Sequence, residues 1–282
     1  MITSSIDEEA FRNFERARHD ALAQSYHNFF APITALAVTL LLDAARVGPD
    51  SKLLDVATGS GVLAAVAAGR GAQVVGVDLA PNMVVLAASL HPELEFREAD
   101  VEALPFEDGV FDAVICNFGL GHFPSAERAI TECVRVLASG GRLAVSWWDE
   151  PSRQRIQGLF IDALAETRAS APTSIPAGPP MFRFSADSEL ANLLSGAGLV
   201  EVTVTQHGSS YLVRDAESLW RGGLGSLART SAVVISQTPE VQKRICTAFH
   251  RLAGAYASAE GLAVPISFKV AAGVRGAVHK GG

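Results

Sequence analysis

The spacing of hydrophobic and polar positions changes after the first fifty residues. Residues 7–24 carry apolar side chains such as Phe11 at helical spacing, and residues 31–46 do the same with Pro32 in the first turn. Further along, short apolar runs alternate with helix-like stretches. The pattern predicts two N-terminal helices followed by repeated strand–helix units.

The apolar runs have the length of strands, and the stretches between them have the length of helices. The predicted strands cover 52–57, 72–78, 94–100, 111–117 and 140–148. The predicted helices between them cover 62–69, 81–90 and 125–137. This alternation predicts an α/β fold with a parallel sheet and right-handed crossovers.

The alternation stops after Trp148. Residues 151–184 contain a helical stretch and the Pro/Gly-rich segment SAPTSIPAGPPMF, which is too long for an ordinary connection. The remaining predicted elements are helices at 187–197, 215–229 and 239–257 and strands at 200–208 and 265–275. The expected organisation is an N-terminal helical cap, a nucleotide-binding core, a lid insertion, and a completion of the core sheet that contains a second helical lid insertion. These parts cover 1–48, 49–150, 151–185 and 186–282, with the second insertion at 209–262.

The turn after the first predicted strand carries the candidate chemistry. It reads LLDVATGSGVLA, and Gly59 and Gly61 in it satisfy the G-x-G-x-x-A spacing of a dinucleotide-binding turn. Asp78 ends the next predicted strand, where a ribose-binding carboxylate belongs. Asp55 and Asp100 also end predicted strands. NAD leaves these last two carboxylates unused, because backbone amides at a helix N-terminus bind its pyrophosphate.

S-adenosylmethionine (SAM) uses all of these features. Asp55 can face its ammonium, directly or through water, and the glycines let the backbone approach its carboxylate and ribose. Asp78 can accept both ribose hydroxyls. Asp100 can take the adenine amino group, with the Val101 amide beside it. The turn therefore favours SAM as the cofactor.

Four blocks of sequence resemble class I SAM-dependent methyltransferases, specifically the ubiquinone/menaquinone-methyltransferase-like group known as type 11. They are LLDVATGSG, VVGVDLAPNM, READVEALPFEDGVFDAVICNFGLGHF and RVLASGGRLAVS, spread over roughly residues 50–150. The resemblance implies a Rossmann-like, seven-stranded, mostly parallel sheet with an antiparallel last strand and helices on both faces. Ala57, Thr58 and Ser60 stand where many relatives have Gly, Cys and Thr.

The resemblance also implies which residues bind the cofactor. In relatives, the acid matching Asp78 holds the ribose and the residue matching Met83 packs on the adenine. Asp100 and Val101 would contact the adenine edge. Asn117 and Phe118, at the end of the fourth predicted strand, would line the methionine end. The expected cofactor-binding set is Tyr26, Asp55, Ala57, Gly59, Gly61, Asp78, Leu79, Met83, Asp100, Val101, Asn117 and Phe118. Two of these have an alternative explanation, since Met83 fits a core position and Tyr26 fits plain lid packing.

His122, in NFGLGHFPS, is the candidate catalytic residue. It follows the fourth predicted strand, and an imidazole suits a general base if the acceptor is a phenol or an activated carbon. The alternative is that His122 packs a loop beside Phe123. The seven histidines show no His–His or His–carboxylate ligand spacing, so no metal site is expected.

Composition and charge exclude several classes of partner. The formal net charge is −7 without a basic stripe, and N-F-G-L replaces the N/D-P-P-Y/F of base-modifying enzymes, so nucleic acid is not an expected partner. Three cysteines without C-x-x-C spacing indicate a reducing compartment. A polar N-terminus and short apolar runs predict a soluble, cytoplasmic protein with no membrane partner. Whether it forms a homodimer stays open.

The expected function is methyl transfer from SAM to an apolar small molecule, either a secondary metabolite or a quinone-like acceptor. The lid insertions are rich in apolar side chains, and His207 and Trp220 are further candidates for facing the acceptor. One alternative is a SAM-binding cyclase or pericyclase of the same fold that keeps the methyl group. A SAM-sensing module is less favoured, because long apolar lids indicate an enclosed acceptor.

Overall fold

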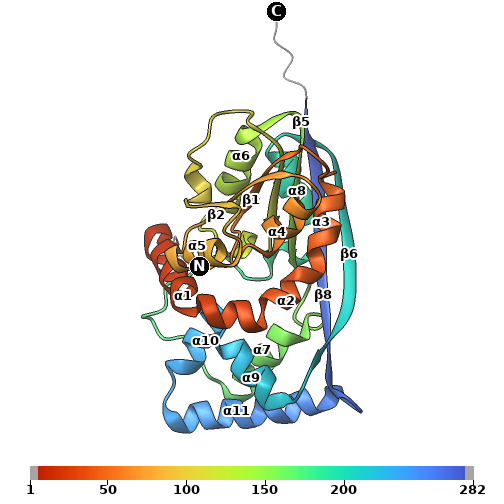
Figure 1. Ribbon diagram of the computed structural model, residues 1–282. Coiled ribbons are helices and arrows are strands. Elements are labelled where there is room, and N and C mark those ends of the chain that lie inside the picture. The colour runs from red at the N-terminus through yellow and green to blue at the C-terminus, as the bar shows by residue number, and fades with distance from the viewer. Residues whose placement is uncertain (1–5, 277–282) are drawn as a thin grey trace, which may run out of the picture.

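One twisted sheet runs through the molecule (Figure 1). The computed structural model describes residues 6–276. The strands are β1 (Lys52–Val56), β2 (Gln73–Asp78), β3 (Glu95–Glu98), β4 (Phe111–Asn117), β5 (Leu137–Trp148), β6 (Leu199–Val213), β7 (Ala257–Ser258) and β8 (Gly261–Arg275). They are ordered β3-β2-β1-β4-β5-β8-β6, and the short β7 pairs with β8. Strands β1 to β5 pair in parallel, whereas β8 is antiparallel to both of its long neighbours. The Rossmann-like fold with an antiparallel last strand is confirmed.

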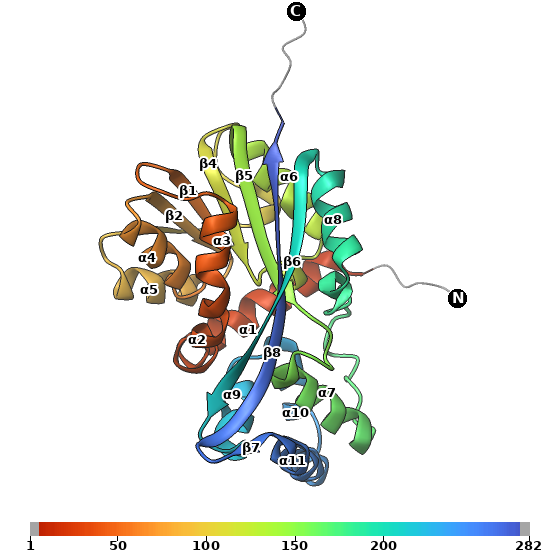
Figure 2. The ribbon, with the colours of Figure 1, turned by 90° about the vertical axis from the view of Figure 1, so that its right-hand side faces the viewer.

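The helices cover both faces of this sheet. They are α1 (Glu8–Phe29), α2 (Ala31–Thr34), α3 (Val38–Ala44), α4 (Val62–Gly69), α5 (Pro81–Leu90), α6 (Ala126–Val136), α7 (Arg155–Thr167), α8 (Asp187–Gly196), α9 (Ala216–Leu224), α10 (Ala228–Ile235) and α11 (Pro239–Ala253). Short 3₁₀ turns include η2 (Val101–Ala103) and η3 (Leu120–His122). Helices α3, α4 and α5 lie on one face and α6 and α8 on the other (Figure 2).

Polar caps explain where several of these helices begin. The side chains of Asp7, Ser125, Asp215 and Thr238 each accept a hydrogen bond from a backbone amide three residues further on. Such a cap satisfies one of the free amides at a helix N-terminus. The same residue types therefore fix the starts of α1, α6, α9 and α11.

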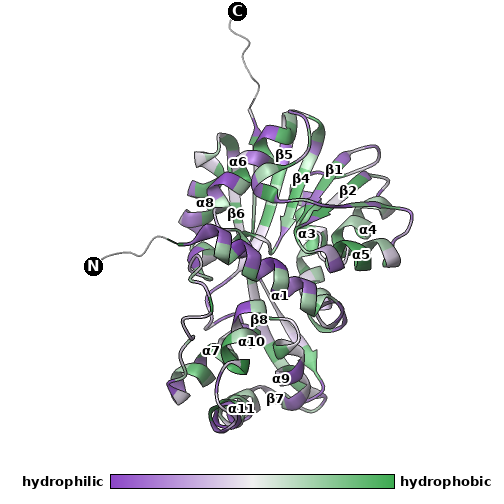
Figure 3. Ribbon diagram, turned by 90° about the vertical axis from the view of Figure 1, so that its left-hand side faces the viewer, coloured by the Kyte–Doolittle hydropathy of each residue, from purple (hydrophilic) through white to green (hydrophobic). Residues whose placement is uncertain are grey.

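A second layer of helices lies beyond the sheet. Strands β6 and β8 continue past the other strands as a two-stranded ribbon, paired as far as Val213 and Leu262. Helices α7, α9, α10 and α11 gather around its far end (Figures 1 and 2). Their shared core is aromatic, with the Phe160 ring 5.2 Å from Trp220 and 4.4 Å from Phe249. Helix α1 crosses between the two layers with a largely hydrophilic ribbon (Figure 3).

Several element predictions were wrong in detail. The single helix expected at 31–46 is α2, a 3₁₀ turn at Ala35–Ala37 and α3. The single helix expected at 215–229 is two helices, α9 and α10, joined around Gly225. Two glycines near the end of α9 allow close packing. A Cβ on Gly222 would lie 2.2 Å from the ring of Phe29, and one on Gly223 would lie 2.3 Å from the ring of Phe160. The expected insertion at 209–262 begins inside β6, which continues to Val213.

Among residues 6–276, no single helix is both long enough and apolar enough to cross a membrane. The bent pair of α1 and the helices that follow it meets that test by length and composition only. The predicted cap and the predicted C-terminal part each include a few residues, 1–5 and 277–282, that lie outside the described range.

Candidate functional site

A cavity of about 810 Å³ lies where α1 crosses the carboxyl ends of β1, β2 and β4. Most of the predicted site residues line it, namely Tyr26, Ala57, Gly59, Asp78, Leu79, Met83, Asp100, Val101, Asn117, Phe118 and His122. The structure thus brings together residues from five separate segments of the chain. Two predicted residues, Asp55 and Gly61, are not in the lining.

The turn after β1 explains where these two residues lie instead. Asp55 is 1% exposed and accepts a hydrogen bond from the Thr58 hydroxyl at 2.7 Å. Burial raises the pKa of Asp55 to about 7, against the lowering effect of that hydrogen bond. Gly61 has φ +81°, and a Cβ there would lie 2.9 Å from both His91 and Phe96. Gly61 therefore serves the turn and the packing beneath it, and Asp55 lies below the floor of the cavity.

The same turn contains an alanine in a backbone conformation that favours glycine. Ala57 has φ +54°, in the left-handed region. This is the position at which many members of the type 11 group have Gly. The Cβ of Ala57 makes this conformation costly by about 1–2 kcal/mol, so the surrounding turn must hold it in place.

Asp78 is held in a fixed orientation at the end of β2. Its Oδ2 accepts from the Gly59 amide at 2.9 Å, and its Oδ1 accepts from the Ala80 amide at 3.0 Å. Burial raises the pKa of Asp78, while the two amides lower it. Met83, 2% exposed, lines the cavity nearby. The carboxylate is therefore preorganised to accept further hydrogen bonds from a bound ligand.

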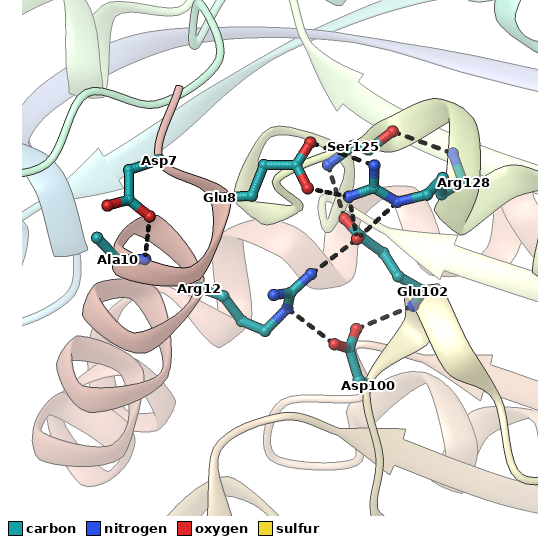
Figure 4. A network of polar contacts seen from close by, with 8 residues as sticks. All are labelled: Asp7, Glu8, Ala10, Arg12, Asp100, Glu102, Ser125 and Arg128. Carbon is teal, nitrogen blue, oxygen red and sulfur yellow. Dashed lines mark hydrogen bonds and ion pairs between the residues drawn. The ribbon is translucent and has the colours of Figure 1, made fainter. Parts of the chain in front are cut away.

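Asp100 has a partner that the sequence did not reveal. Its Oδ2 lies 2.8 Å from Arg12 Nε on α1, and its Oδ1 accepts from the Glu102 amide at 2.9 Å. Arg12 also pairs with Glu102, which in turn pairs with Arg128 on α6, and Arg128 reaches Glu8 on α1 (Figure 4). This network, which we call the α1 clasp, fixes α1 over the end of the cavity where Asp100 and Val101 lie.

The opposite end of the cavity has a strained backbone. Phe118 has φ +58°, and its amide donates to Ser146 Oγ at 3.0 Å. The Ser146 hydroxyl donates to Asn117 Oδ1 at 2.8 Å, and the Asn117 amide nitrogen donates to the carbonyl of Thr34. The Phe118 ring stacks on Trp148 with centroids 3.8 Å apart. Strain that is held by several partners is typical of functional sites.

His122 belongs to a cluster of ionisable side chains. Its Nδ1 lies 2.9 Å from Oε2 of Glu15, a carboxylate that is 2% exposed. His19 Nδ1 lies 3.5 Å from the same oxygen, and Arg229 Nε lies 3.2 Å from Oε1. Burial lowers the pKa of His122 although Glu15 opposes it. Burial raises the pKa of Glu15, but His122, His19 and Arg229 outweigh this, so the net pKa is lowered.

The expectation that no ligand spacing exists was wrong. Glu15 and His19 are four residues apart on one face of α1, and His122 approaches them, so that one ligand atom from each lies within 4.8 Å of the others. Glu217, Cys246 and His250 form a second such group between α9 and α11. The Glu-x-x-x-His spacing at residues 15–19 is a His–carboxylate ligand spacing that the sequence does contain.

A second cavity, of about 470 Å³, adjoins the first and shares His19, Tyr26, Phe118 and His122 with it. We call it the acceptor chamber, for the role proposed for it below. Its walls combine aromatic rings with several polar groups; residues missed by sequence reasoning include Phe30, Trp147, Trp148, Gln157, Arg229 and Thr230. Gln157 is 6% exposed, and its Oε1 has no hydrogen-bond partner among residues 6–276. In the sequence, only the unusual length of the lid segments indicated that they cover a cavity.

His207 and Trp220, the two further candidates for facing the acceptor, pack in other parts of the molecule. His207 stacks on Phe268 along the β6–β8 ribbon, with centroids 5.7 Å apart. Trp220 packs in the aromatic core of the second layer. Neither lines a cavity described above, so the suggestion that they face the acceptor was wrong.

Comparison with known proteins agrees with this geometry. Residues 54–145 match the family model described as a methyltransferase domain. A demethylmenaquinone methyltransferase from Thermus thermophilus is 45% identical over 118 residues, which cover 40% of this chain and 54% of that protein. The chain therefore spans only about half the length of this relative.

Solved structures share the fold. The YcgJ protein from Bacillus subtilis superposes with a TM-score of 0.54 at 20% identity, covering 86% of this chain and 98% of that one. The [4+2]-cyclase SpnF gives a TM-score of 0.52, also at 20% identity, covering 86% of this chain and 80% of that one. At this level of identity the likeness concerns the fold alone.

Proposed function

We propose that the whole chain transfers the methyl group of SAM to a small, largely apolar acceptor, because residues 54–145 match the model of a methyltransferase domain. The observation that carries the proposal is that two cavities meet at His19, Tyr26, Phe118 and His122. One cavity has the residues expected for the cofactor, and the other has the aromatic lining expected for an acceptor.

The cofactor residues take their roles from their positions. We assign Asp78 to the ribose hydroxyls, Met83 and Val101 to the adenine, and the backbone at Ala57 and Gly59 to the methionine carboxylate. Leu79, Asp100, Asn117 and Phe118 complete the lining. Asp55 would act on the ammonium through Thr58 or water, because its carboxylate lies beneath the surface.

The acceptor chamber indicates what is methylated. The Phe118 and Trp148 rings, stacked at 3.8 Å, present a flat apolar wall. The free Oε1 of Gln157 requires a hydrogen-bond donor, because an unpaired buried acceptor is costly. The preferred acceptor is therefore a planar, quinone-like or secondary-metabolite molecule that bears a hydroxyl or N–H group.

Residues at the junction then guide the transfer. Bound SAM supplies an electrophilic methyl group. The aromatic walls exclude water and align the acceptor atom, and His122 accepts the proton that an acceptor hydroxyl loses. Tyr26 does not serve as the base, because burial raises its pKa to about 12.

Calorimetry with S-adenosylhomocysteine tests the cofactor site. Asp78→Asn should weaken binding by about 1–3 kcal/mol, because the charged acceptor for two ribose hydroxyls is lost. Asp108→Asn is the matched control, since that side chain is exposed and lies outside both cavities. Tight binding of NAD in place of S-adenosylhomocysteine would contradict the assignment.

Label transfer separates this function from the second candidate, a SAM-binding cyclase that keeps the methyl group. The structural likeness to SpnF motivates that alternative. The protein is incubated with methyl-labelled SAM and a panel of planar hydroquinones and phenols. Label in the product supports methyl transfer. Conversion of an acceptor without label transfer supports the cyclase and contradicts our proposal.

A further inference from the structure

The environment of His122 is more elaborate than packing requires. A carboxylate that is 2% exposed is costly unless it is paired, and each Glu15 oxygen has a partner of a different kind. Oε2 is hydrogen-bonded to His122 Nδ1 at 2.9 Å, whereas Oε1 lies 3.2 Å from Arg229 Nε in an ion pair whose two atoms make no hydrogen bond within the described part of the chain. We infer that Glu15 and Arg229 are positioning residues that hold His122 as the proton acceptor, so that docking of α1 completes the catalytic site; the inference rests on the proposed methyl transfer.

The hydrogen bond to Glu15 determines which nitrogen of His122 carries the proton. An ionised carboxylate can only accept, so His122 Nδ1 must donate. The lone pair of a neutral imidazole is then on Nε2. Carboxylates orient histidines in this way in other active sites, where they also stabilise the imidazolium that forms. Glu15 therefore prepares His122 to take up a proton at Nε2.

Arg229 fixes the backbone that carries His122. Its guanidinium donates to the carbonyl oxygens of Gly121, next to His122, and of Pro179 in the lid segment. It also lies over the ring of Phe11, 5.1 Å from the centroid. One side chain thus connects α10, α1, the η3 turn and the lid. The geometry of His122 depends on all four being in place.

The same cluster has the composition of a metal site, but its charges favour proton handling. His19 Nδ1 lies 2.9 Å from the carbonyl oxygen of Glu15 and donates to it, so only Nε2 of His19 keeps a lone pair. Arg229 already supplies the positive charge that a metal ion would bring to Glu15. A cation beside a guanidinium would be repelled.

The step balances without any further reactant. The acceptor O–H proton passes to His122 Nε2 as the bond between the acceptor oxygen and the methyl carbon forms. The bond between carbon and sulfur breaks, and its electron pair stays on sulfur as S-adenosylhomocysteine. Imidazolium faces the Glu15 carboxylate, and it releases its proton to solvent when the site opens.

Nitrogen-15 NMR of the histidine side chains tests the inference without an acceptor. The spectra report the tautomer and pKa of His122, assigned by comparison with His122→Asn. The charged and titratable groups around His122 are Glu15 and His19 from α1, Arg229 from α10 and Asp78 from β2. We expect the Nδ1–H tautomer in the wild-type protein.

Two substitutions should then move the His122 pKa in opposite directions. Glu15→Gln should lower it by about one to two pH units, because an adjacent negative charge is removed, and Arg229→Gln should raise it. The matched controls are Glu9→Gln, an exposed glutamate on the same helix, and Arg214→Gln, whose side chain is 82% exposed. Both controls should leave the pKa unchanged.

Several results would overturn the inference. One is an Nε2–H tautomer of His122 in the wild-type protein, a result that does not depend on any variant folding. Another is an unchanged His122 pKa in both folded variants, Glu15→Gln and Arg229→Gln. Tight binding of Zn²⁺ that abolishes the Nδ1–H signal would also do so, by showing a metal site. S-adenosylhomocysteine calorimetry on the same samples keeps the two proposals apart, because failure there concerns the cofactor and not His122.

Discussion

The buried carboxylates in this protein have opposite pKa shifts because their partners differ. Asp55 has one hydroxyl partner, and burial raises its pKa to about 7. Glu15 is equally buried, yet two histidines and an arginine lower its pKa. An acid that accepts a hydrogen bond from an imidazole and faces an arginine stays charged at neutral pH, which is the state needed to orient that imidazole.

Substitution of His122 should affect turnover and not cofactor affinity. His122→Ala should reduce turnover by about 10²–10⁴-fold, the usual contribution of a positioned base. Because burial lowers the pKa of His122, the neutral base predominates at neutral pH. The wild-type rate should therefore rise as pH increases through that pKa and then level off, and the variant should lose the rising limb.

The control for this experiment is His207→Ala, which lies outside both cavities. It should keep the wild-type pH profile. A His122→Ala protein with full turnover and unchanged pH dependence would show that alignment alone drives the transfer.

Local sequence predicted the lining of the first cavity better than the surroundings of His122. Gly59 and Asp78 are joined by one hydrogen bond and belong to a motif that spans two strands. Glu15 contacts His122 across 107 positions. No periodicity links a cap helix to a loop so far away, so the partners of His122 could be found only in the folded chain.

At the scale of elements, the lid segment depends on a glycine at its contact with α1. A Cβ on Gly178 would lie 2.1 Å from the ring of Phe11, which is fully buried. Gly178→Ala should therefore lower the free energy of unfolding by about 1–3 kcal/mol, the usual effect of overpacking. Denaturant unfolding measures this change.

Gly196→Ala is the matched control, because a Cβ there meets no atom within 4 Å. It should leave stability unchanged or slightly raise it, since alanine favours the helix. Equal stability of both variants would show that the lid adjusts without cost.

Elements were predictable where caps and periodicity agreed. Helices α4 and α5 and strand β4 have the expected bounds, since each is enclosed by turn residues. The β6–β8 ribbon is longer than expected because the outer part of β6 is exposed, without the alternation that marks a half-buried strand. Its length comes from pairing with β8, which is a tertiary effect.

At the scale of the whole molecule, the acceptor chamber lies where both layers meet. Its lining comes from α1, the end of β5, α7, the lid segment and the start of α10. These pieces are contributed by nearly the full length of the described chain. Sequence reasoning indicated that the lid segments cover something, but it could not predict which residues face inward.

The α1 clasp predicts a kinetic effect, because α1, docked across the cavity, should slow the departure of a bound cofactor. Ion pairs that are partly exposed, as Arg12 and Arg128 are, weaken with ionic strength. Dissociation of S-adenosylhomocysteine, followed by stopped-flow fluorescence, should therefore accelerate with added salt, and Arg12→Met should be fast at every salt concentration.

The exposed Arg214→Met protein should behave like the wild type in this measurement, and a dissociation rate independent of both salt and Arg12 would contradict the idea. The residence time of the spent cofactor is thus set by surface charges on a helix and not by the depth of the pocket. If release of the spent cofactor limits turnover, moderate salt should raise the turnover rate by weakening the clasp. Higher salt should lower it, because undocking α1 also removes Glu15 from His122.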